Sequence, residues 1–269
     1  MTSAAANASI KPIRIAVQIQ PQHADYAKIR DTVLRAEELG VDIVFNWDHF
    51  FPLNGDPDGK HFECWTMLGA WAEQTERVQI GALVTGGGYR NPDLLADMAR
   101  TVDHISGGRL ILGIGGGWKE KDYDEYGYEF GTPGSRLNLL GNEYLPRIAA
   151  RLKVLNPLPT RPIPLLIGGG GERKTLKYVA NFASIWHAFG DLDTMKHKSA
   201  VLAEHCGAIG RDPAGIEHST AANGTDTSSA SALADGGFSL FTIGVSGPDY
   251  DLSTVPGWLA WRDERNGSR

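Results

Sequence analysis

An aspartate and a histidine stand side by side in the segment Asn46-Trp47-Asp48-His49-Phe50. The pair ends a short apolar run whose length and β-branched content are typical of a strand. A carboxylate beside an imidazole can orient the ring and tune its pKa, so Asp48 and His49 could serve a proton transfer. A loop-anchoring aspartate next to a structural histidine would give the same sequence, and the local residues leave both interpretations open.

Two glycine-rich segments follow predicted strands. The first, Thr85-Gly86-Gly87-Gly88, permits unusual backbone angles and lets a planar group lie on the main chain, although a flexible turn would also use these residues. The second, residues 113–118, contains G-x-G-x-x-G only loosely. Because an aromatic and charged segment follows it in place of a helix, we reject a dinucleotide-binding fingerprint here.

A third segment, Gly168, Gly169, Gly170 and Gly171, lies between a predicted strand and a predicted helix. Glycines leave backbone N–H groups free to converge on an anion, and the positive end of the helix helps. Arg173 and two nearby lysines add local positive charge. Anion binding is therefore favoured over a plain glycine-rich turn, while the spacing of a Walker A loop is absent.

Short β-branched runs alternate with longer amphipathic patterns along the chain, which predicts βα units and a parallel sheet. The predicted strands are residues 13–19, 43–46, 78–84, 110–114, 164–167, 184–187, 215–219 and 238–243. The predicted helices are residues 25–39, 63–75, 92–105, 136–153, 172–181, 194–209, a weak one at 229–235, and 250–262.

Eight strands in this length indicate an α/β fold, a single-domain (β/α)8 TIM barrel. We expect a flexible tail at residues 1–12 and a barrel domain at residues 13–265, with a shortened seventh βα unit. The connections after the second and fourth strands, residues 47–62 and 115–135, are longer than usual. Long loops at the carboxyl ends of barrel strands are where such proteins carry out chemistry.

The composition narrows the possible partners. The chain has 269 residues and a formal net charge of −6, which argues against nucleic acid or an acidic membrane as a partner. Its apolar runs are too short to span a bilayer, and its start lacks the pattern of a signal peptide, so a cytoplasmic protein is expected. The two cysteines and eight histidines show no metal-ligand spacing, so no metal is predicted.

Four stretches of the chain resemble the bacterial luciferase-like family, and most closely its actinobacterial coenzyme F420-dependent oxidoreductases. They are DH at residues 48–49, YRNP at 89–92, DHISGGRL running into LGIGGGW at 103–118, and IGGGG at 167–171. The resemblance implies a TIM barrel that holds a flavin or 5-deazaflavin at the carboxyl ends of its strands. It also implies a cis peptide bond near Leu83-Val84.

By the same resemblance, His49 exchanges a proton with the substrate and Asp48 lies near the edge of the deazaflavin ring. The residues that line the cofactor would be Leu83, Val84, Thr85, Gly115, Gly116 and Gly117, with Gly168, Gly169, Gly170, Gly171 and Arg173 at its phosphate. An aromatic substrate pocket would come from Trp47, Phe50, Trp65 and Trp118. The sugar-phosphate dehydrogenases of this group have a glutamate where Trp118 stands, so an apolar or planar substrate is expected.

The expected function is therefore hydride transfer between coenzyme F420 and a small organic molecule, in a homodimer. Lys119, Lys121 and Arg173 favour F420, whose tail is polyglutamate, over FMN. An FMN-dependent luciferase-like monooxygenase is the alternative of the same fold. A non-catalytic flavin- or deazaflavin-binding protein is the alternative of another class.

Overall fold

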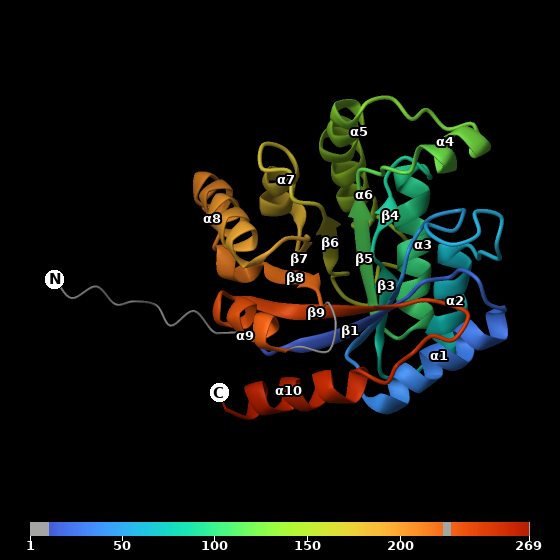
Figure 1. Ribbon diagram of the computed structural model, residues 1–269. Coiled ribbons are helices and arrows are strands. Elements are labelled where there is room, and N and C mark those ends of the chain that lie inside the picture. The colour runs from blue at the N-terminus through green and yellow to red at the C-terminus, as the bar shows by residue number, and fades with distance from the viewer. Residues whose placement is uncertain (1–10, 223–226, 269) are drawn as a thin grey trace.

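The computed structural model describes residues 11–222 and 227–268. In these residues a parallel sheet closes into a barrel, because β3 pairs with both β2 and β5 and so completes the strand order β3-β2-β1-β9-β8-β7-β6-β5. Figure 1 shows the strands at the centre with helices outside them. The strands are β1 Arg14–Ile19, β2 Ile43–Asn46, β3 Gln79–Ala82, β4 Thr85–Gly86, β5 Leu110–Gly115, β6 Leu165–Gly168, β7 Ile185–His187, β8 Glu217–Ala221 and β9 Phe238–Val245.

The third barrel strand is interrupted, so β3 and β4 together occupy one position in the barrel. The break falls at Leu83-Val84, whose peptide bond is cis, as predicted. The amide of Gln18 on β1 donates a hydrogen bond to the Leu83 carbonyl across 2.8 Å. After the break, Thr85 and Gly86 pair with β5.

Helices follow the strands in the order expected of a (β/α)8 barrel, and the fold prediction is confirmed. They are α1 Tyr26–Leu39, α2 Cys64–Gln74, α3 Pro92–Ile105, α4 Glu120–Tyr126, α5 Pro133–Leu139, α6 Leu145–Arg151, α7 Thr175–Phe182, α8 Leu192–Ala208, α9 Ser228–Asp235 and α10 Val255–Gly267. The helix of the seventh unit, α9, is short as predicted. The predicted tail lies almost entirely outside the described residues, as do residues 223–226 of the seventh unit.

The connection after β5 differs most from the prediction. The segment expected as a loop contains α4, and the single helix expected at residues 136–153 is α5, a π-helical turn at Leu140–Tyr144, and α6. Helix α5 begins at Pro133 because Thr132 and Ser135 form a capping box, with proline at the first helical position. In Figure 1, α4 and α5 lie at the top of the view, beyond the end of β5.

Three further boundaries differ. Strand β8 begins at Glu217 because residues 213–215 form a 3-10 turn, and α7 begins at Thr175, after the glycines. Helix α10 begins at Val255, five residues after the predicted start. In each case a turn or loop occupies residues that had been assigned to the element, and element ends are where boundary prediction is weakest.

Two apolar clusters hold the barrel together. The larger one lies between the strands and the helices. The smaller one contains residues from six strands, all 3% exposed or less, and fills the inside of the barrel. Its members are Ala16, Ile43, Phe45, Ile111, Leu166, Ile185 and Leu240. The inside of the barrel is therefore a packed core rather than a pore. The cavity described below lies past this core, at the carboxyl ends of the strands.

In the described residues, no helix is long and apolar enough to cross a membrane.

Candidate functional site

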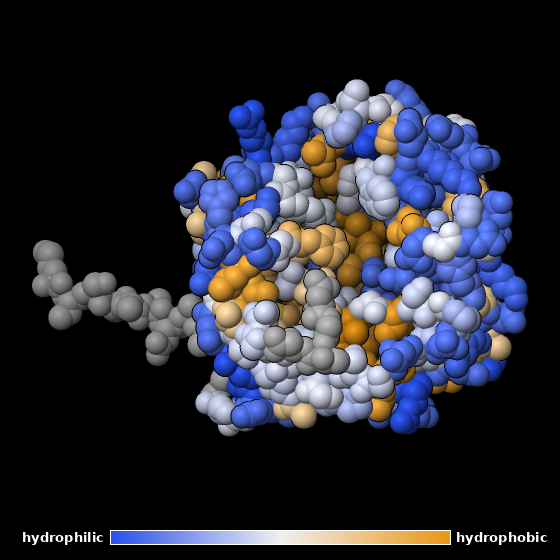
Figure 2. All heavy atoms as spheres, viewed as in Figure 1, coloured by the Kyte–Doolittle hydropathy of each residue, from blue (hydrophilic) through white to orange (hydrophobic). Residues whose placement is uncertain are grey.

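A cavity of about 750 Å³ lies at the carboxyl ends of the strands. Side chains alternate along a strand, so the residue two positions after an inward core residue also faces inward. By this rule Gln18 follows Ala16, Gly168 follows Leu166, and both line the cavity. Figure 2 shows an apolar hollow, in orange, near the centre of the molecule with hydrophilic residues around it.

Most of the predicted site residues meet in this cavity. Those that line it are Trp47, Asp48, His49, Leu83, Val84, Thr85, Gly115, Gly116, Gly117, Trp118, Gly168 and Gly169. They come from the ends of β2, β3, β5 and β6 and from the intervening loops. The residues Gly170, Gly171, Arg173, Phe50 and Trp65 are not among the lining residues.

One wall of the cavity is flat because Val84 packs against two glycines. A Cβ atom at Gly115 would lie 2.8 Å from Cγ2 of Val84, and one at Gly168 would lie 3.1 Å from Cγ1. Any other residue at either position would therefore have to displace Val84. The result is a broad surface of main chain and one aliphatic side chain, which suits a planar ring.

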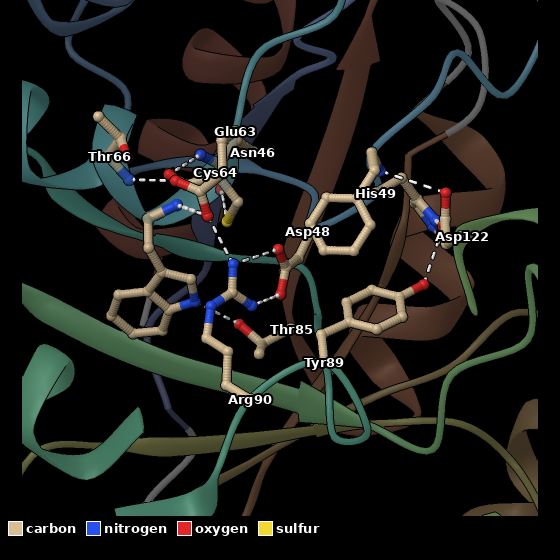
Figure 3. A network of polar contacts seen from close by, with 12 residues as sticks. Asn46, Asp48, His49, Glu63, Cys64, Thr66, Thr85, Tyr89, Arg90 and Asp122 are labelled. Carbon is tan, nitrogen blue, oxygen red and sulfur yellow. Dashed lines mark hydrogen bonds and ion pairs between the residues drawn. The ribbon is translucent and has the colours of Figure 1, made fainter. Parts of the chain in front are cut away.

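His49 is held by a partner that the sequence did not reveal. Its Nδ1 lies 2.6 Å from Oδ2 of Asp122 on α4, and the Tyr89 hydroxyl donates to the same oxygen across 2.8 Å (Figure 3). The other carboxylate oxygen accepts the backbone N–H of Phe50 across 3.2 Å. Burial raises the pKa of Asp122, but these hydrogen bonds outweigh it and the net pKa is lowered.

This arrangement defines the chemistry open to His49. Because an ionised Asp122 can only accept, Nδ1 of His49 carries a proton, and Nε2 is the ring atom left for exchange with a ligand. The side chain is 12% exposed and lines the cavity. A histidine oriented in this way can donate or accept a proton at the cavity surface.

Asp48 does not orient His49, contrary to the sequence interpretation. It is buried and forms a two-pronged ion pair with Arg90, with distances of 2.5 and 3.0 Å. Arg90 also contacts Glu63 across 2.5 Å, and Figure 3 shows the guanidinium between the two carboxylates. Burial raises the pKa of Asp48 and Arg90 opposes that shift. Adjacent side chains of an extended segment point in different directions, which separates Asp48 from its neighbour.

Two of the four predicted pocket aromatics lie elsewhere. Phe50 stacks on Tyr126 with ring centroids 4.2 Å apart, outside the cavity lining. Trp65 is buried on α2, and its Nε1 donates to Thr85 Oγ1 across 3.0 Å, so it supports the wall from behind. Both were assigned to the pocket by residue type alone, whereas the direction of each side chain decides what it contacts.

The other two aromatics do line the cavity. Trp47 is buried, and its Nε1 donates to Nε2 of His61 across 3.1 Å. Trp118 is 62% exposed and meets the His49 ring edge-on at 5.5 Å. The two tryptophans therefore stand on either side of His49, one anchored and one at the cavity mouth.

The glycine loop after β6 contributes less backbone to the cavity than predicted. The N–H of Gly169 already donates to the His187 carbonyl across 2.9 Å, so it is not free for an anion. Within the described part of the chain, the N–H groups of Gly170 and Gly171 make no such hydrogen bond. Lys198 on α8, which the sequence analysis did not single out, places its ammonium 2.6 Å from the Gly170 carbonyl.

Several lining residues were not predicted. Gly86 and Tyr89 lie in segments that the sequence analysis quoted, whereas most of the others are marked by no local motif. The full set is Gln18, Leu53, Gly86, Tyr89, Pro133, Arg136, Leu137, Thr175, His187, Phe189, Ala221, Thr242 and Gly244. Most come from β1, β7, β8, β9 and the α4–α5 region, where the sequence has neither glycine clusters nor paired ionisable groups. Among the described residues, no group of three His, Cys, Asp or Glu side chains could hold a metal ion.

This fold and site define the class of protein as a TIM barrel that has a cavity at the carboxyl ends of its strands and a partly buried histidine lining it. The luciferase-like monooxygenase family model matches residues 8–140. The chain therefore belongs to the luciferase-like monooxygenase family.

Individual relatives cover part of the chain. An F420-dependent glucose-6-phosphate dehydrogenase of Amycolatopsis mediterranei is 30% identical over 159 residues, which are 51% of this chain and 46% of that protein. The chain spans about half the length of the curated relatives it matches.

Solved structures share the fold at low identity. An F420-dependent secondary alcohol dehydrogenase, in complex with an F420-acetone adduct, matches 92% of this chain and 99% of its own, with a TM-score of 0.77 and 17% identity. A second match is a type II Baeyer-Villiger monooxygenase from Pseudomonas putida, in complex with FMN. The match covers 78% of this chain and 67% of that protein's chain, with a TM-score of 0.63 and 16% identity.

Proposed function

We propose that the protein is an F420-dependent oxidoreductase that transfers a hydride between a deazaflavin and a small organic substrate. One observation supports this most directly. The cavity combines a flat wall, made by Val84, Gly115 and Gly168, with a histidine held for proton exchange. Reduction of a carbonyl, or oxidation of an alcohol, needs both a surface for the planar hydride carrier and a proton donor or acceptor.

The residues present fit a deazaflavin. Val84 and the two glycines would support the planar ring, and Gly115, Gly116 and Gly117 leave its edge uncovered by side chains. The segment from Gly168 to Thr175 would hold the phosphate, with the free N–H groups after Gly169 as donors. When bound, such a cofactor supplies the hydride.

The chain's own contribution is positioning and proton transfer. His49, fixed by Asp122, would exchange the proton at Nε2, while Trp47 and Trp118 exclude water from the reacting end of the cavity. Asp48 and Arg90 do not take part in proton transfer in this proposal. They brace the loop after β2 and so keep His49 in place.

The substrate expected from the lining is small and has apolar or planar character. Trp118 provides an exposed aromatic surface directly beside His49. Asp48 is paired with Arg90, and Arg136 donates to the carbonyls of Gly117 and Phe130. Among the described lining residues a sugar phosphate would find one arginine, whose guanidinium already binds main-chain carbonyls.

We favour F420 over FMN because of the cations near the mouth. Lys119 lies 5.9 Å from the ring of Trp118, and Arg173 is exposed on the loop after β6. Lys121 contacts the ring of Phe51 at 4.4 Å and lies 4.0 Å from Asp58, so its ammonium group is less available to bind an anionic tail. The negative charge of a polyglutamate tail would be attracted to these cations, whereas the single phosphate of FMN needs only the glycine loop.

Titration of the purified protein with F420 and with FMN, followed by quenching of cofactor fluorescence, tests the proposal. We expect F420 to bind at micromolar concentration and more tightly than FMN, with an affinity that falls as salt is added. Binding of FMN without binding of F420 would instead favour the FMN-dependent monooxygenase. Binding of either cofactor without turnover of any alcohol or ketone would favour a non-catalytic binding protein. The homodimer remains a prediction, which sedimentation velocity tests.

A further inference from the structure

Two side chains that line the cavity each have one polar atom without a hydrogen-bond partner among the described residues. His187 is 3% exposed and Thr242 is 4% exposed, and both line the cavity. Within the described residues, neither Nε2 of His187 nor Oγ1 of Thr242 has a hydrogen-bond partner. Buried polar atoms are nearly always hydrogen-bonded in folded proteins, so two such atoms on one cavity wall point to a ligand that supplies the missing partner.

The two side chains share a wall because of strand register. His187 on β7 pairs with Ser219 on β8, and Ala221, two residues further along β8, pairs with Thr242 on β9. In the barrel order, β8 and β9 stand across from β3 and β5. Thr242 on β9 therefore faces the flat wall of Val84 and Gly115 from the other side of the cavity. His187 lies beside that wall, because β7 is the neighbour of β6 and His187 pairs with Gly168.

Ser219 fixes which nitrogen of His187 carries the proton. The Ser219 hydroxyl lies 2.8 Å from Nδ1 of His187, and it contacts no other acceptor among the described residues. Only if Ser219 donates to Nδ1 does its own buried hydrogen find a partner. Nε2 of His187 then carries the hydrogen and donates into the cavity. Burial also lowers the pKa of His187 to about 4, so the ring is neutral.

The character of the missing partner follows from these donors. His187 offers an N–H and Thr242 a hydroxyl, so the pair suits an oxygen that accepts two hydrogen bonds. An anionic oxygen would require a cation beside these two donors. Arg136, the cation among the described lining residues, is on α5 after β5, the strand across the barrel from β9. An uncharged oxygen is the better match.

We propose that His187 and Thr242 bind an uncharged carbonyl or hydroxyl oxygen of the substrate, on the side of the cavity formed by β7, β8 and β9. This inference rests on the proposed function, because it assigns the surface of Val84 to the cofactor and the space bounded by β7, β8 and β9 to the substrate. It narrows the substrate to neutral molecules that carry such an oxygen and excludes pure hydrocarbons as good ligands.

The test compares two probes of similar shape, cyclohexanone and methylenecyclohexane, of which only the first has an accepting oxygen. Their binding to the F420-loaded protein, and to the protein without cofactor, is measured by ligand-observed NMR titration. We expect cyclohexanone to bind about 25-fold more tightly, the effect of roughly two hydrogen bonds. In protein labelled with 15N-histidine, cyclohexanone should also shift the Nε2 signal of His187.

Thr242→Val keeps the shape of the side chain and removes its hydroxyl, while Thr242→Ser keeps the hydroxyl. We expect the valine variant to lose about fivefold in cyclohexanone affinity with no change for methylenecyclohexane, and the serine variant to stay within twofold of wild type. Equal binding of the two probes to wild type would overturn the inference, as would a valine variant that still binds cyclohexanone normally.

Cofactor titrations of the same variants separate the possible sources of the oxygen. If the substrate supplies it, Thr242→Val binds F420 within twofold of wild type. A fivefold or larger loss of F420 affinity would show that the oxygen belongs to the cofactor ring and would overturn the substrate assignment. If F420 fails to bind wild type while the cofactor-free protein still prefers cyclohexanone, the proposed function fails but the oxygen-binding pair stands.

Discussion

His49 and Asp122 are 73 residues apart in the sequence, yet Nδ1 of the histidine lies 2.6 Å from Oδ2 of the aspartate. The two residues belong to the long connections after β2 and β5, which meet over the cavity. The aspartate side chain is fully buried and also accepts hydrogen bonds from Tyr89 and Phe50. The orientation of His49 is thus set by a different loop from its own.

The first prediction concerns His49 itself. We expect His49→Ala to lower turnover of F420 with an active alcohol or ketone by about 10²-fold or more, since general acid–base catalysis contributes that much. The affinity for F420 should stay within a few-fold, because His49 is not on the flat wall. Steady-state kinetics and fluorescence titration measure the two quantities. Turnover close to wild type would mean that His49 is structural.

The second prediction concerns the positioning role of Asp122. Asp122→Asn keeps the shape but removes the charge that holds His49, and we expect kcat to fall about 10-fold or more with little change in KM. The double variant with His49→Ala should be no slower than His49→Ala alone, because the aspartate acts through the histidine. Tyr89→Phe is the matched control, because it removes only the hydrogen bond from the Tyr89 hydroxyl to Asp122. It should lower kcat less than Asp122→Asn does. Additive losses in the double variant would contradict this role.

The third prediction is that Arg90 is required for stability. Arg90→Met leaves Asp48 buried without its partner, and we expect a loss of about 3–5 kcal/mol in the free energy of unfolding. Replacing Asp48 by asparagine in the same chain should recover part of the loss, because no unpaired charge remains. Urea denaturation measures both variants. Arg30→Met is the control, since the Arg30–Asp31 pair is exposed and should contribute less than about 1 kcal/mol.

The fourth prediction concerns the contact between Gly115 and Val84. Gly115→Ala places a Cβ 2.8 Å from the valine, and we expect a loss of about 1–3 kcal/mol in stability and weaker F420 binding. Adding Val84→Ala removes the clashing methyl group and should restore part of the stability. Gly69→Ala is the control, because a Cβ there meets nothing within 4 Å. If Val84→Ala fails to relieve the effect, the clash is not its cause.

The fifth prediction is a pH dependence of stability. Burial lowers the pKa of His61, His187 and His218 to about 4, from an ordinary value near 6.5. Between these values the unfolded chain binds more protons than the folded one, so stability falls as the pH is lowered from 7.5 to 5.5. The expected loss is about 1 kcal/mol for each of the three histidines.

Urea denaturation at the two pH values, on wild type and His218→Phe, tests this dependence. His218 packs edge-on against Trp186 and Phe238, so phenylalanine keeps the ring but cannot bind a proton. We expect the variant to lose about one third of the difference between the two pH values. A variant with the full wild-type dependence would show that His218 is not among the groups responsible.

Local patterns were sufficient to predict the barrel, since all eight predicted strands are present with shifts of at most two residues at either end, apart from the break in the third. Glycine clusters likewise marked positions that line the cavity at Gly115 and Gly168, although Gly168 was expected at the phosphate and lies against Val84. Both kinds of signal are local, because strand alternation and glycine content are properties of a few neighbouring residues.

The partners inside the site could not be predicted in the same way. Asp122, His187 and Thr242 stand in segments with no distinctive motif. Only the closed fold brings Asp122 to His49, and His187 and Thr242 to the cavity. The pairing of Asp48 with Arg90 rather than with its neighbour depends on side-chain direction, which sequence adjacency does not determine. Asp122 was further hidden because the segment around it was expected to be a loop and is a helix.

The contacts between the two long loops have a consequence for how such a protein could be re-engineered. Phe50 stacks on Tyr126 and Phe51 meets Lys121, so the loop after β2 packs against α4 along several residues. Exchanging either loop alone with that of a homologue would break this packing. The two connections therefore form one transplantable unit, and chimaeras meant to change substrate preference should exchange both together.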